Sequence, residues 1–437
     1  EKFSFFLILI LPFSLITGPA IPDISITLIG LCFLSLLFFN KQFSNIYTYY
    51  WVLISIFFWL FLIFISLFSE NKYLAYRDAI IFIRILFIPI FIYFFVFNNE
   101  KRIKQLTLIV FLAVIFVCLD TIYQFTNYDP LHGFGSDIFG FLPEPEFYGR
   151  LSGPFKDLVP GAYVSKFTLL GLVFIILHFK NKKLEMTLSI VYLTLAGFVT
   201  YISGERMALA TFILGLSLLI IFFKKRRLTF LISMILIIIS SFLANKIHPI
   251  YNDYTIIEST PYHLGLKIEK TYTCKDTQNN ECKKIINMQP SFVKVLQNFS
   301  NSSYGQIYSL SLKMWKDHPL HGIGLNNFTN LCNNDQKYQN SIKNYNCVTH
   351  PHNFYLQWLV ETGIFGLLLF LIYIYLIFNF VYNNIASPYA IIALATLTIL
   401  FWPIMSTGSL LKNWMGVSTF YIIGICLSFI RIKQKIL

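Results

Sequence analysis

Long apolar runs, separated by polar connectors, recur along almost the whole chain. A run of about 20 residues crosses the hydrocarbon core of a bilayer as a helix, because lipid offers the backbone no other hydrogen-bond partners. The runs are too uniformly apolar to be strands of a membrane barrel, in which side chains alternate. The pattern predicts an all-α polytopic membrane protein with about twelve transmembrane helices, at 3–17, 22–40, 48–68, 79–97, 105–125, 161–179, 184–203, 206–223, 228–244, 354–380, 386–405 and 415–430.

Two connectors are too long to be turns, and they set the expected domain organisation. The first is 126–160, and the second is 245–353, which is rich in Asn, Lys, Tyr and Ser. We expect helices 1–9 within 1–244, a large soluble loop at 245–353 and helices 10–12 within 354–437. No A-x-A-like cleavage site follows the first apolar run, so we expect a retained span rather than a signal peptide.

Basic residues are distributed by membrane side rather than gathered into one surface. Only 13% of the residues are charged and 56% are hydrophobic, whereas about 25% of a soluble protein is charged. The net charge of +13 could suggest nucleic acid, but Lys and Arg concentrate in alternate connectors and in both tails, which is the positive-inside pattern. Both chain ends are therefore expected in the cytoplasm and both long connectors outside. The run Lys224–Arg227 could contact anionic lipid headgroups, although a role in orienting the chain is the simpler interpretation.

Four of the seven cysteines lie in the long outer connector, at Cys274, Cys282, Cys332 and Cys347. An oxidising compartment favours two disulfides, for which three connectivities are possible. We favour the local pairs Cys274 with Cys282 and Cys332 with Cys347, because each closes a short loop. A zinc site is the alternative, but the spacings lack a C-x2-C element.

The sequence holds no P-loop, GxGxxG, HExxH or GxSxG element. Nothing in it points to ATP or to a redox cofactor. That absence favours chemistry driven by an activated substrate already present in the membrane, and we expect no cofactor.

The point where the long outer connector re-enters the membrane has the sequence THPHNFYLQWLVETGIFG, from Thr349. It resembles the O-antigen ligase and polymerase superfamily, whose ligase signature is His, then Asn, Ser or Gln, nine residues, Gly, two residues, and Gly, Thr or Tyr. His352, Asn353, Gly363 and Gly366 match this signature. A histidine at the outer end of a span can take a proton from a sugar hydroxyl. We therefore favour a catalytic role for His352 over helix capping, and ordinary close packing for the glycines.

A second segment, WKDHPLHGIGLNNF at 315–328, resembles the family's recurrent HPLxGxGxxxF element. His318–Pro319 and Gly322–Gly324 predict a turn after a helix, and hence a structural role. His321, His350 and Asn353 are further candidates for contact with the substrate.

Several arginines fall where a positive charge is costly or topologically disfavoured. Arg206, in SGERMAL, resembles the family's Ser/Gly-x-Arg element that opens a span on the outer side. A guanidinium there suits a pyrophosphate, which it can grip with two hydrogen bonds. Arg150 and Lys156, around an RxxGxF-like element, and Arg84 within the fourth span are further candidates for binding the pyrophosphate or glycan. Each could instead pair with Asp78, Asp120 or Asp157, or reach toward the interface.

The resemblance implies a GT-C-like helical fold and an inverting, metal-independent glycosyltransferase in the bacterial inner membrane, with its active site facing the periplasm. Its donor would be a polyprenyl-pyrophosphate-linked glycan (O-antigen) and its acceptor a lipid A-core sugar hydroxyl, with membrane lipid as a further partner and no nucleic acid. His352 would act as the base, and Arg206 would neutralise the leaving group. The O-antigen polymerase remains an alternative, because Ala210 stands where the ligase-type R-x3-L spacing has Leu. A protein O-oligosaccharyltransferase and, from a different class, a membrane transporter are also compatible with the sequence.

Overall fold

The chain forms two compact units, in which most of the described residues are helical. The computed structural model describes residues 2–39, 46–96, 100–129, 133–142, 148–156, 160–252, 254–259, 266–273, 281–289, 292–339, 347–385, 387–404 and 406–430. Unit 1 comprises Glu1–Leu15, Pro19–Gln105 and Tyr304–Leu437, and unit 2 comprises Ile16–Gly18 and Leu106–Ser303. The expected outer loop therefore contributes to both units.

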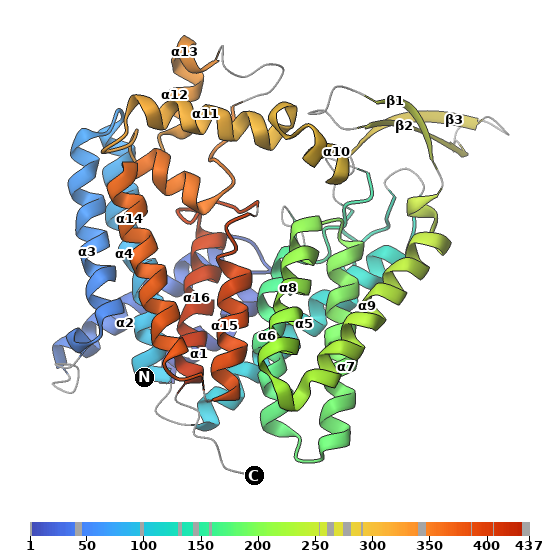
Figure 1. The fold of residues 1–437 in the computed structure, drawn as a ribbon, viewed down its shortest axis with the longest axis horizontal. Helices are drawn as coiled ribbons and strands as arrows, with labels where there is room; N and C mark the ends of the chain where they lie inside the picture. The colour runs from blue at the N-terminus through green and yellow to red at the C-terminus, as the bar shows by residue number, and fades with distance from the viewer. Residues whose placement is uncertain are drawn as a thin grey trace. The chain divides into compact units, whose positions relative to one another are not determined.

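Unit 1 is a helical bundle built from both ends of the chain. It contains α1 (Lys2–Ser14), α2 (Ala20–Phe39), α3 (Tyr50–Ile65), α4 (Lys72–Phe91), the first turn of α5 (Glu100–Thr126), α14 (Phe354–Tyr382), α15 (Pro388–Leu400) and α16 (Asn413–Phe429). Helix α16 packs against α2, α4, α14 and α15, and nearly all its residues are buried. Figure 1 shows α16 beside α15. Aromatic rings fill the space between helices: Trp358 of α14 meets Phe58 of α3 edge to face at 4.9 Å and Phe82 of α4 at 5.7 Å.

Three further helices of unit 1 follow one another in the outer loop. They are α11 (Ser303–Asp317), α12 (Phe328–Asn334) and α13 (Gln336–Gln339). Helix α11 is amphipathic, and it buries Ile307, Leu310 and Met314 against Phe328 and Tyr338. Cys332 and Cys347 form a disulfide with a Cα–Cα distance of 5.9 Å, which is one of the two favoured local pairs. Cys274 lies outside the described residues, as does the side chain of Cys282.

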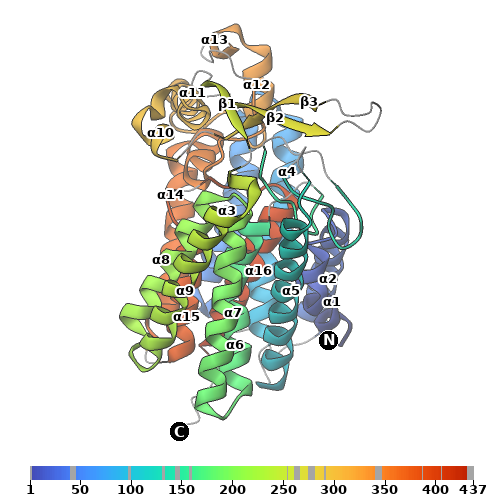
Figure 2. The same ribbon diagram turned by 90° about the vertical axis from the view of Figure 1, so that its right-hand side faces the viewer.

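Unit 2 combines a helical bundle with a small sheet. Its helices are the rest of α5, α6 (Pro160–His178), α7 (Lys182–Ile202), α8 (Arg206–Phe222), α9 (Arg227–Ile247) and the short α10 (Phe292–Gln297). Helix α7 packs against α6, α8 and α9. Strands β1 (Thr255–Ser259), β2 (Leu266–Thr273) and β3 (Glu281–Met288) form an antiparallel sheet in that order, visible in Figure 2. The first long connector is tied to this sheet, because the Tyr148 N–H donates to the Asn287 carbonyl at 2.8 Å. The expectation of a purely helical chain missed these strands.

Helices occupy every segment in which the sequence predicted a span. Among the described residues, six helices are long and apolar enough to cross a membrane: Tyr50–Phe68, Glu100–Thr126, Pro160–His178, Lys182–Ile202, Lys224–Ile247 and Phe354–Tyr382. Five more apolar helices are shorter, at Lys2–Ser14, Ala20–Ser35, Arg206–Phe222, Pro388–Leu400 and Asn413–Phe429. The total of twelve crossings stays a prediction.

Candidate functional site

The first cluster of candidate residues lies in unit 1, just before α14. His352 has a left-handed backbone, with φ +56°, and its carbonyl accepts a hydrogen bond of 2.8 Å from the Thr407 N–H. Its ring lies 4.2 Å from the ring of His350, and the Tyr304 ring faces it edge-on at 6.1 Å. We call His350, His352, Tyr304 and Thr407 the histidine site. A left-handed residue other than glycine is costly, so the contacts around it must hold this conformation.

The histidine site keeps its rings uncharged. Burial lowers the pKa of His352, and the Thr407 backbone opposes the shift only in part. Burial, the neighbouring His352 and, to a smaller extent, Lys412 lower the pKa of His350 to about 3. Both imidazoles are therefore neutral at neutral pH, and a neutral imidazole can accept a proton.

Asn353, expected to contact substrate, has its amide engaged in the fold. Its side-chain oxygen caps α14 by accepting from the N–H groups of Tyr355 and Leu356, at 3.0 and 3.1 Å. Its Nδ2 donates to the Pro403 carbonyl at 2.8 Å, and the Tyr355 hydroxyl donates to the Phe401 carbonyl at 2.6 Å. These bonds fix the start of α14 against the segment between α15 and α16, which also carries Thr407.

Helix α14 is broken at Gly363, and the loop at 319–324 forms backbone hydrogen bonds with the residues on both sides of the break. Gly363 has φ +69° and ψ −169°. The N–H groups of Ile323 and Gly324 donate to the carbonyls of Val360 and Glu361 at 2.9 Å each, and the Ile364 N–H donates to the Pro319 carbonyl at 3.0 Å. Gly363 thus does more than allow ordinary packing.

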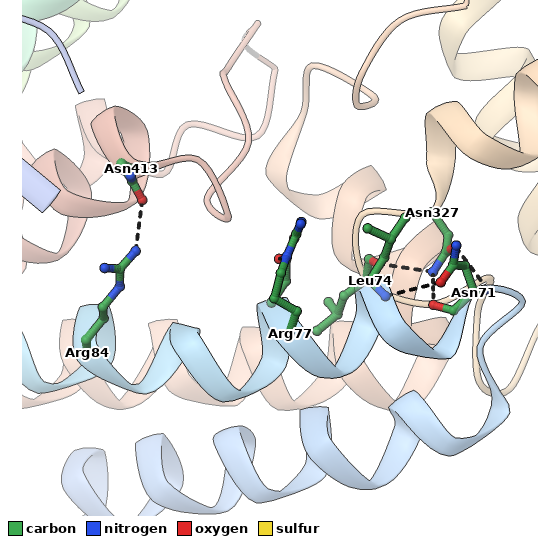
Figure 3. A network of polar contacts seen from close by, with 8 residues as sticks. Asn71, Leu74, Arg77, Arg84, Asn327 and Asn413 are labelled. Atoms are coloured by element: carbon green, nitrogen blue, oxygen red, sulfur yellow. Dashed lines mark hydrogen bonds and ion pairs between the residues drawn. The ribbon is translucent and has the colours of Figure 1, made fainter. Parts of the chain in front are cut away.

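The HPLxGxG-like segment is the turn after α11 that the sequence predicted, with φ +69° at Gly322 and +95° at Gly324. A Cβ atom on Gly322 would lie 2.5 Å from the Thr362 nitrogen, so this approach of backbone to backbone requires glycine. The same loop is tied to the start of α4, because Asn327 exchanges two hydrogen bonds with the Asn71 backbone at 3.2 and 3.3 Å (Figure 3).

His321 lies in this loop, with Nδ1 2.7 Å from the Gly322 carbonyl and its ring stacked on Phe68 at 5.9 Å. These contacts orient His321 within its own turn. The structure gives it no shared contact with His352 among the described residues, so a role in substrate binding stays a prediction.

Arg84 of α4 forms an ion pair with an acidic residue of unit 1. Its Nη2 lies 2.6 Å from an Asp23 oxygen of α2, and its Nη1 donates to the Thr27 hydroxyl at 3.1 Å. Nη2 also donates to the Asn413 side-chain oxygen of α16 at 3.2 Å (Figure 3). Arg77 pairs with Asp78 at 2.7 Å. Arg84 therefore pairs with Asp23 rather than with the acids considered from the sequence, and it joins α2, α4 and α16.

The second cluster lies in unit 2, where three separate sequence elements meet. Arg150 Nη2 lies 3.4 Å from a carboxylate oxygen of Glu205, and a Cβ on Gly204 would lie 3.3 Å from the Arg150 side chain. Arg206 is the first residue of α8, and its guanidinium donates to the Gln289 carbonyl at 3.4 Å. Lys166, 5% exposed, lies within α6 and interacts with Glu205. We call Arg150, Lys166, Glu205 and Arg206 the cation site.

The loop that carries Arg150 is fixed by the end of α5. The Gln124 side-chain oxygen accepts from the N–H groups of Ser152 and Gly153 at 3.0 and 2.8 Å, and its Nε2 donates to the Ser152 hydroxyl at 3.0 Å. The end of α5 therefore holds the segment that resembles RxxGxF. Lys156, at the end of this loop, is exposed.

Sequence reasoning missed Lys166, Glu205 and Asp23. A lone lysine within an apolar run is itself a signal, because an ionisable residue at membrane depth is retained only when it is paired or functional. Glu205 directly precedes Arg206 in the sequence, but the sequence motif singles out only Arg206. Asp23 lies far from Arg84 in sequence, so no local pattern links the two.

No described group of three or more His, Cys, Asp or Glu side chains could hold a metal ion. Two cysteines of the alternative zinc site, Cys332 and Cys347, are bonded to each other.

Comparison with known families bears on the residues around both clusters. Residues 190–371 match the family model described as O-antigen ligase. This segment, less than half of the chain, is similar to an O-antigen ligase domain. The matched segment includes Arg206, His321, His350 and His352, whereas Arg84, Arg150 and Lys166 precede it. Together with the apolar helices, the match supports an O-antigen ligase-like, multi-pass membrane enzyme of the ligase or polymerase type. No curated protein matches the chain.

Proposed function

We propose that this O-antigen ligase-like enzyme transfers a glycan from polyprenyl pyrophosphate to a lipid A-core sugar hydroxyl, on the periplasmic side of the bacterial inner membrane. The acceptor oxygen attacks the anomeric carbon of the donor while His352 takes the hydroxyl proton. The bond from that carbon to the pyrophosphate oxygen breaks, the pyrophosphate leaves with the electron pair, and the configuration inverts. Arg206, Arg150, Lys156 and Lys166 neutralise the leaving group.

The state of the His352 ring is the observation that carries the proposal. The ring lies in the outer segment that precedes α14, packed against His350 and Tyr304, and burial lowers its pKa. A protonated imidazole could not accept the hydroxyl proton, so burial keeps the ring in its active form.

The cation site supports the second half of the reaction. A pyrophosphate binds positively charged side chains. In unit 2, Arg150 and Lys166 both interact with the carboxylate of Glu205, which directly precedes Arg206. The pyrophosphate linkage of the donor supplies the energy, which agrees with the lack of an ATP-binding motif. We propose a reaction without metal, so transfer should persist in EDTA.

A polymerase is the second candidate, in which the acceptor is another lipid-linked glycan. The observation that favours it is Ala210, where the ligase-type spacing from Arg206 has Leu. The glycolipid profile of a deletion strain separates the two. Lipid A-core without glycan, together with accumulated polymer, indicates a ligase, and core that carries a single repeat unit indicates a polymerase.

Replacing His352 with Ala tests the catalytic assignment. We expect His352→Ala to lower turnover by about a hundredfold or more, the usual effect of losing a general base, while donor binding persists. The assay is glycan transfer from lipid-linked donor in nanodiscs. His318→Ala is the matched control, because His318 lies in the turn after α11, and it should keep near wild-type turnover. Near wild-type turnover in His352→Ala would make His352 a structural residue.

A further inference from the structure

Glu205 lies between α7 and α8 but does not cap the helix that it precedes. It is the N-cap residue of α8, and its side chain makes no capping hydrogen bond there. Its carboxylate is turned instead toward α6 and the Arg150 loop. One oxygen lies 3.4 Å from Arg150 Nη2, and the backbone N–H of Ala162 donates to the carboxylate.

The place that this carboxylate occupies has the chemistry of an anion site. Ala162 lies in the first turn of α6, whose free N–H groups and dipole attract negative charge. Lys166, one turn further along α6, adds a buried positive charge, and Arg150 adds another. A Cβ on Gly161 would lie 3.2 Å from the Glu205 Cβ and would run into the Ser203 hydroxyl, so glycine permits this close approach.

Phosphate oxygens and carboxylate oxygens seek the same donors, namely guanidinium, ammonium and helix N-terminal N–H groups. Two anions cannot share them at full charge, because like charges at close range in a partly buried site repel strongly. When the donor pyrophosphate binds Arg150 and Lys166, Glu205 must either move away or take up a proton.

We propose that Glu205 is an internal counter-anion of Arg150 and Lys166 that competes with the donor pyrophosphate, so that donor binding is coupled to proton uptake at Glu205. The inference rests on the proposed function, in which these cations bind the pyrophosphate. It makes Glu205 a positioning residue that acts through Arg150 and Lys166. The charged side chains that face it are Arg150 from the loop and Lys166 from α6, with Arg206 next to it on α8.

The acidity of Glu205 suits such a coupling. Burial raises its pKa to about 7, although Arg150, Lys166 and the Ala162 N–H act in the opposite direction. A bound pyrophosphate raises the pKa further, so the complex holds one more proton than the free enzyme on the alkaline side of neutrality. By linkage, donor affinity must then rise as the pH falls from 8 to 6, by about tenfold.

The test measures binding of a synthetic polyprenyl pyrophosphoryl sugar to the full chain in nanodiscs. The pyrophosphate of this probe is a diester whose own acid groups are fully ionised throughout the range. Wild type should bind about tenfold more tightly at pH 6 than at pH 8. Glu205→Gln should bind at pH 8 as tightly as wild type does at pH 6, with no pH dependence. Calorimetry at pH 8 in buffers of different ionisation enthalpy should show proton uptake in wild type and none in Glu205→Gln.

Glu185→Gln is the matched control. It breaks another partly buried ion pair of unit 2, with Arg226 at 2.6 Å, at the opposite end of α7. This variant should keep the wild-type affinity and pH dependence. Thermal unfolding of each variant checks that the fold is retained.

Two outcomes overturn the inference alone. One is weaker donor binding in Glu205→Gln at every pH, because it would mean that the carboxylate only holds the cations in place. The other is an unchanged affinity and pH profile in Glu205→Gln while Arg150→Ala still weakens binding. If Arg150→Ala and Lys166→Met both leave donor affinity unchanged, the assignment of the cation site in the proposed function fails, and this inference fails with it.

Discussion

A histidine that serves as a base must be neutral, and the surroundings of His352 provide this without an acidic partner among the contacts described. The ring is buried beside another imidazole, whose pKa is itself lowered to about 3. Desolvation disfavours the charged form, so the site loses basicity but keeps the ring available as a proton acceptor. An aspartate in the place of His350 would instead favour the charged imidazolium form of His352.

The pH dependence of turnover follows from this lowered pKa. At saturating donor, where donor binding no longer matters, the acidic fall in turnover should be centred below pH 6.5, because burial lowers the pKa of His352 from its ordinary value. Folding stability should also decrease as the pH falls, because the unfolded chain binds more protons than the folded chain below about pH 6.5. An acidic limb of turnover centred at or above pH 6.5 would contradict the assignment.

Arg206 should fail in a different way from His352, because it acts on the donor. Arg206→Ala should weaken donor binding by about ten- to a hundredfold, the range for losing hydrogen bonds to a charged group. Arg206→Lys should recover little, because an ammonium lacks the two-pronged geometry of the guanidinium. Donor titration of each variant measures this. Arg227→Ala, at the exposed start of α9, is the control; an equal loss of affinity there would point to a nonspecific effect of charge.

The candidate residues could be chosen from the sequence, but their partners could not. Arg84, Arg150 and Arg206 stand out because positive charge is rare in apolar surroundings. The partner of Arg84 is Asp23, which comes from another helix. The position of Asn353 next to His352 suggests a substrate contact, yet the fold uses its amide as a helix cap.

At the scale of elements, the break in α14 joins two motifs that are separate in the sequence. The carbonyls of Val360 and Glu361 bond the loop at Ile323–Gly324 instead of continuing the helix. The backbone at Gly363, with φ +69° and ψ −169°, lies in a region that is almost restricted to glycine. This explains why a glycine stands at this point of the signature, with nine residues between it and Asn353.

Gly363→Ala should therefore destabilise the protein. The strained backbone costs on the order of 1–3 kcal/mol, and the added methyl group would run into the Leu320 carbonyl. The midpoint of thermal unfolding in detergent should fall clearly. Gly30→Ala in α2 is the control, because no atom lies within 4 Å of a Cβ there, and alanine suits a helix better than glycine. Equal midpoints for the two variants would show that the break bears no strain.

The helices were predictable because membrane spans follow from long apolar runs, a signal that needs no knowledge of tertiary contacts. The sheet was not. Its strands are short, and Leu266–Thr273 and Glu281–Met288 mix charged and apolar residues without a clean alternation. Their pairing depends on contacts between strands and on the first long connector, through Tyr148 and Asn287.

At the scale of the molecule, sidedness remains the main prediction. In a background without the free thiols Cys32, Cys118 and Cys426, an impermeant reagent added from outside should label a cysteine at Asn287 or near Gly135, but not one near Asn181. Gly135 itself is enclosed by the Asn127 backbone, so the exposed Phe139 is the better position. Lys180 serves for the inner connector and leaves the Asn181 cap intact. Labelling at Lys180 alone would invert the topology.

Unit 1 is assembled from both ends of the chain, and the ribosome makes all of Leu106–Ser303 in between. Helices α2 and α4 are synthesised early, whereas the Asn413 amide that completes the shell of Arg84 is synthesised 329 residues after Arg84. An unpaired guanidinium in lipid is costly, and Asp23 is a charged partner of Arg84 that is synthesised before it. This ion pair thus neutralises the charge of Arg84 during synthesis. It lets the nascent α4 remain in the membrane until its last neighbour, α16, is made.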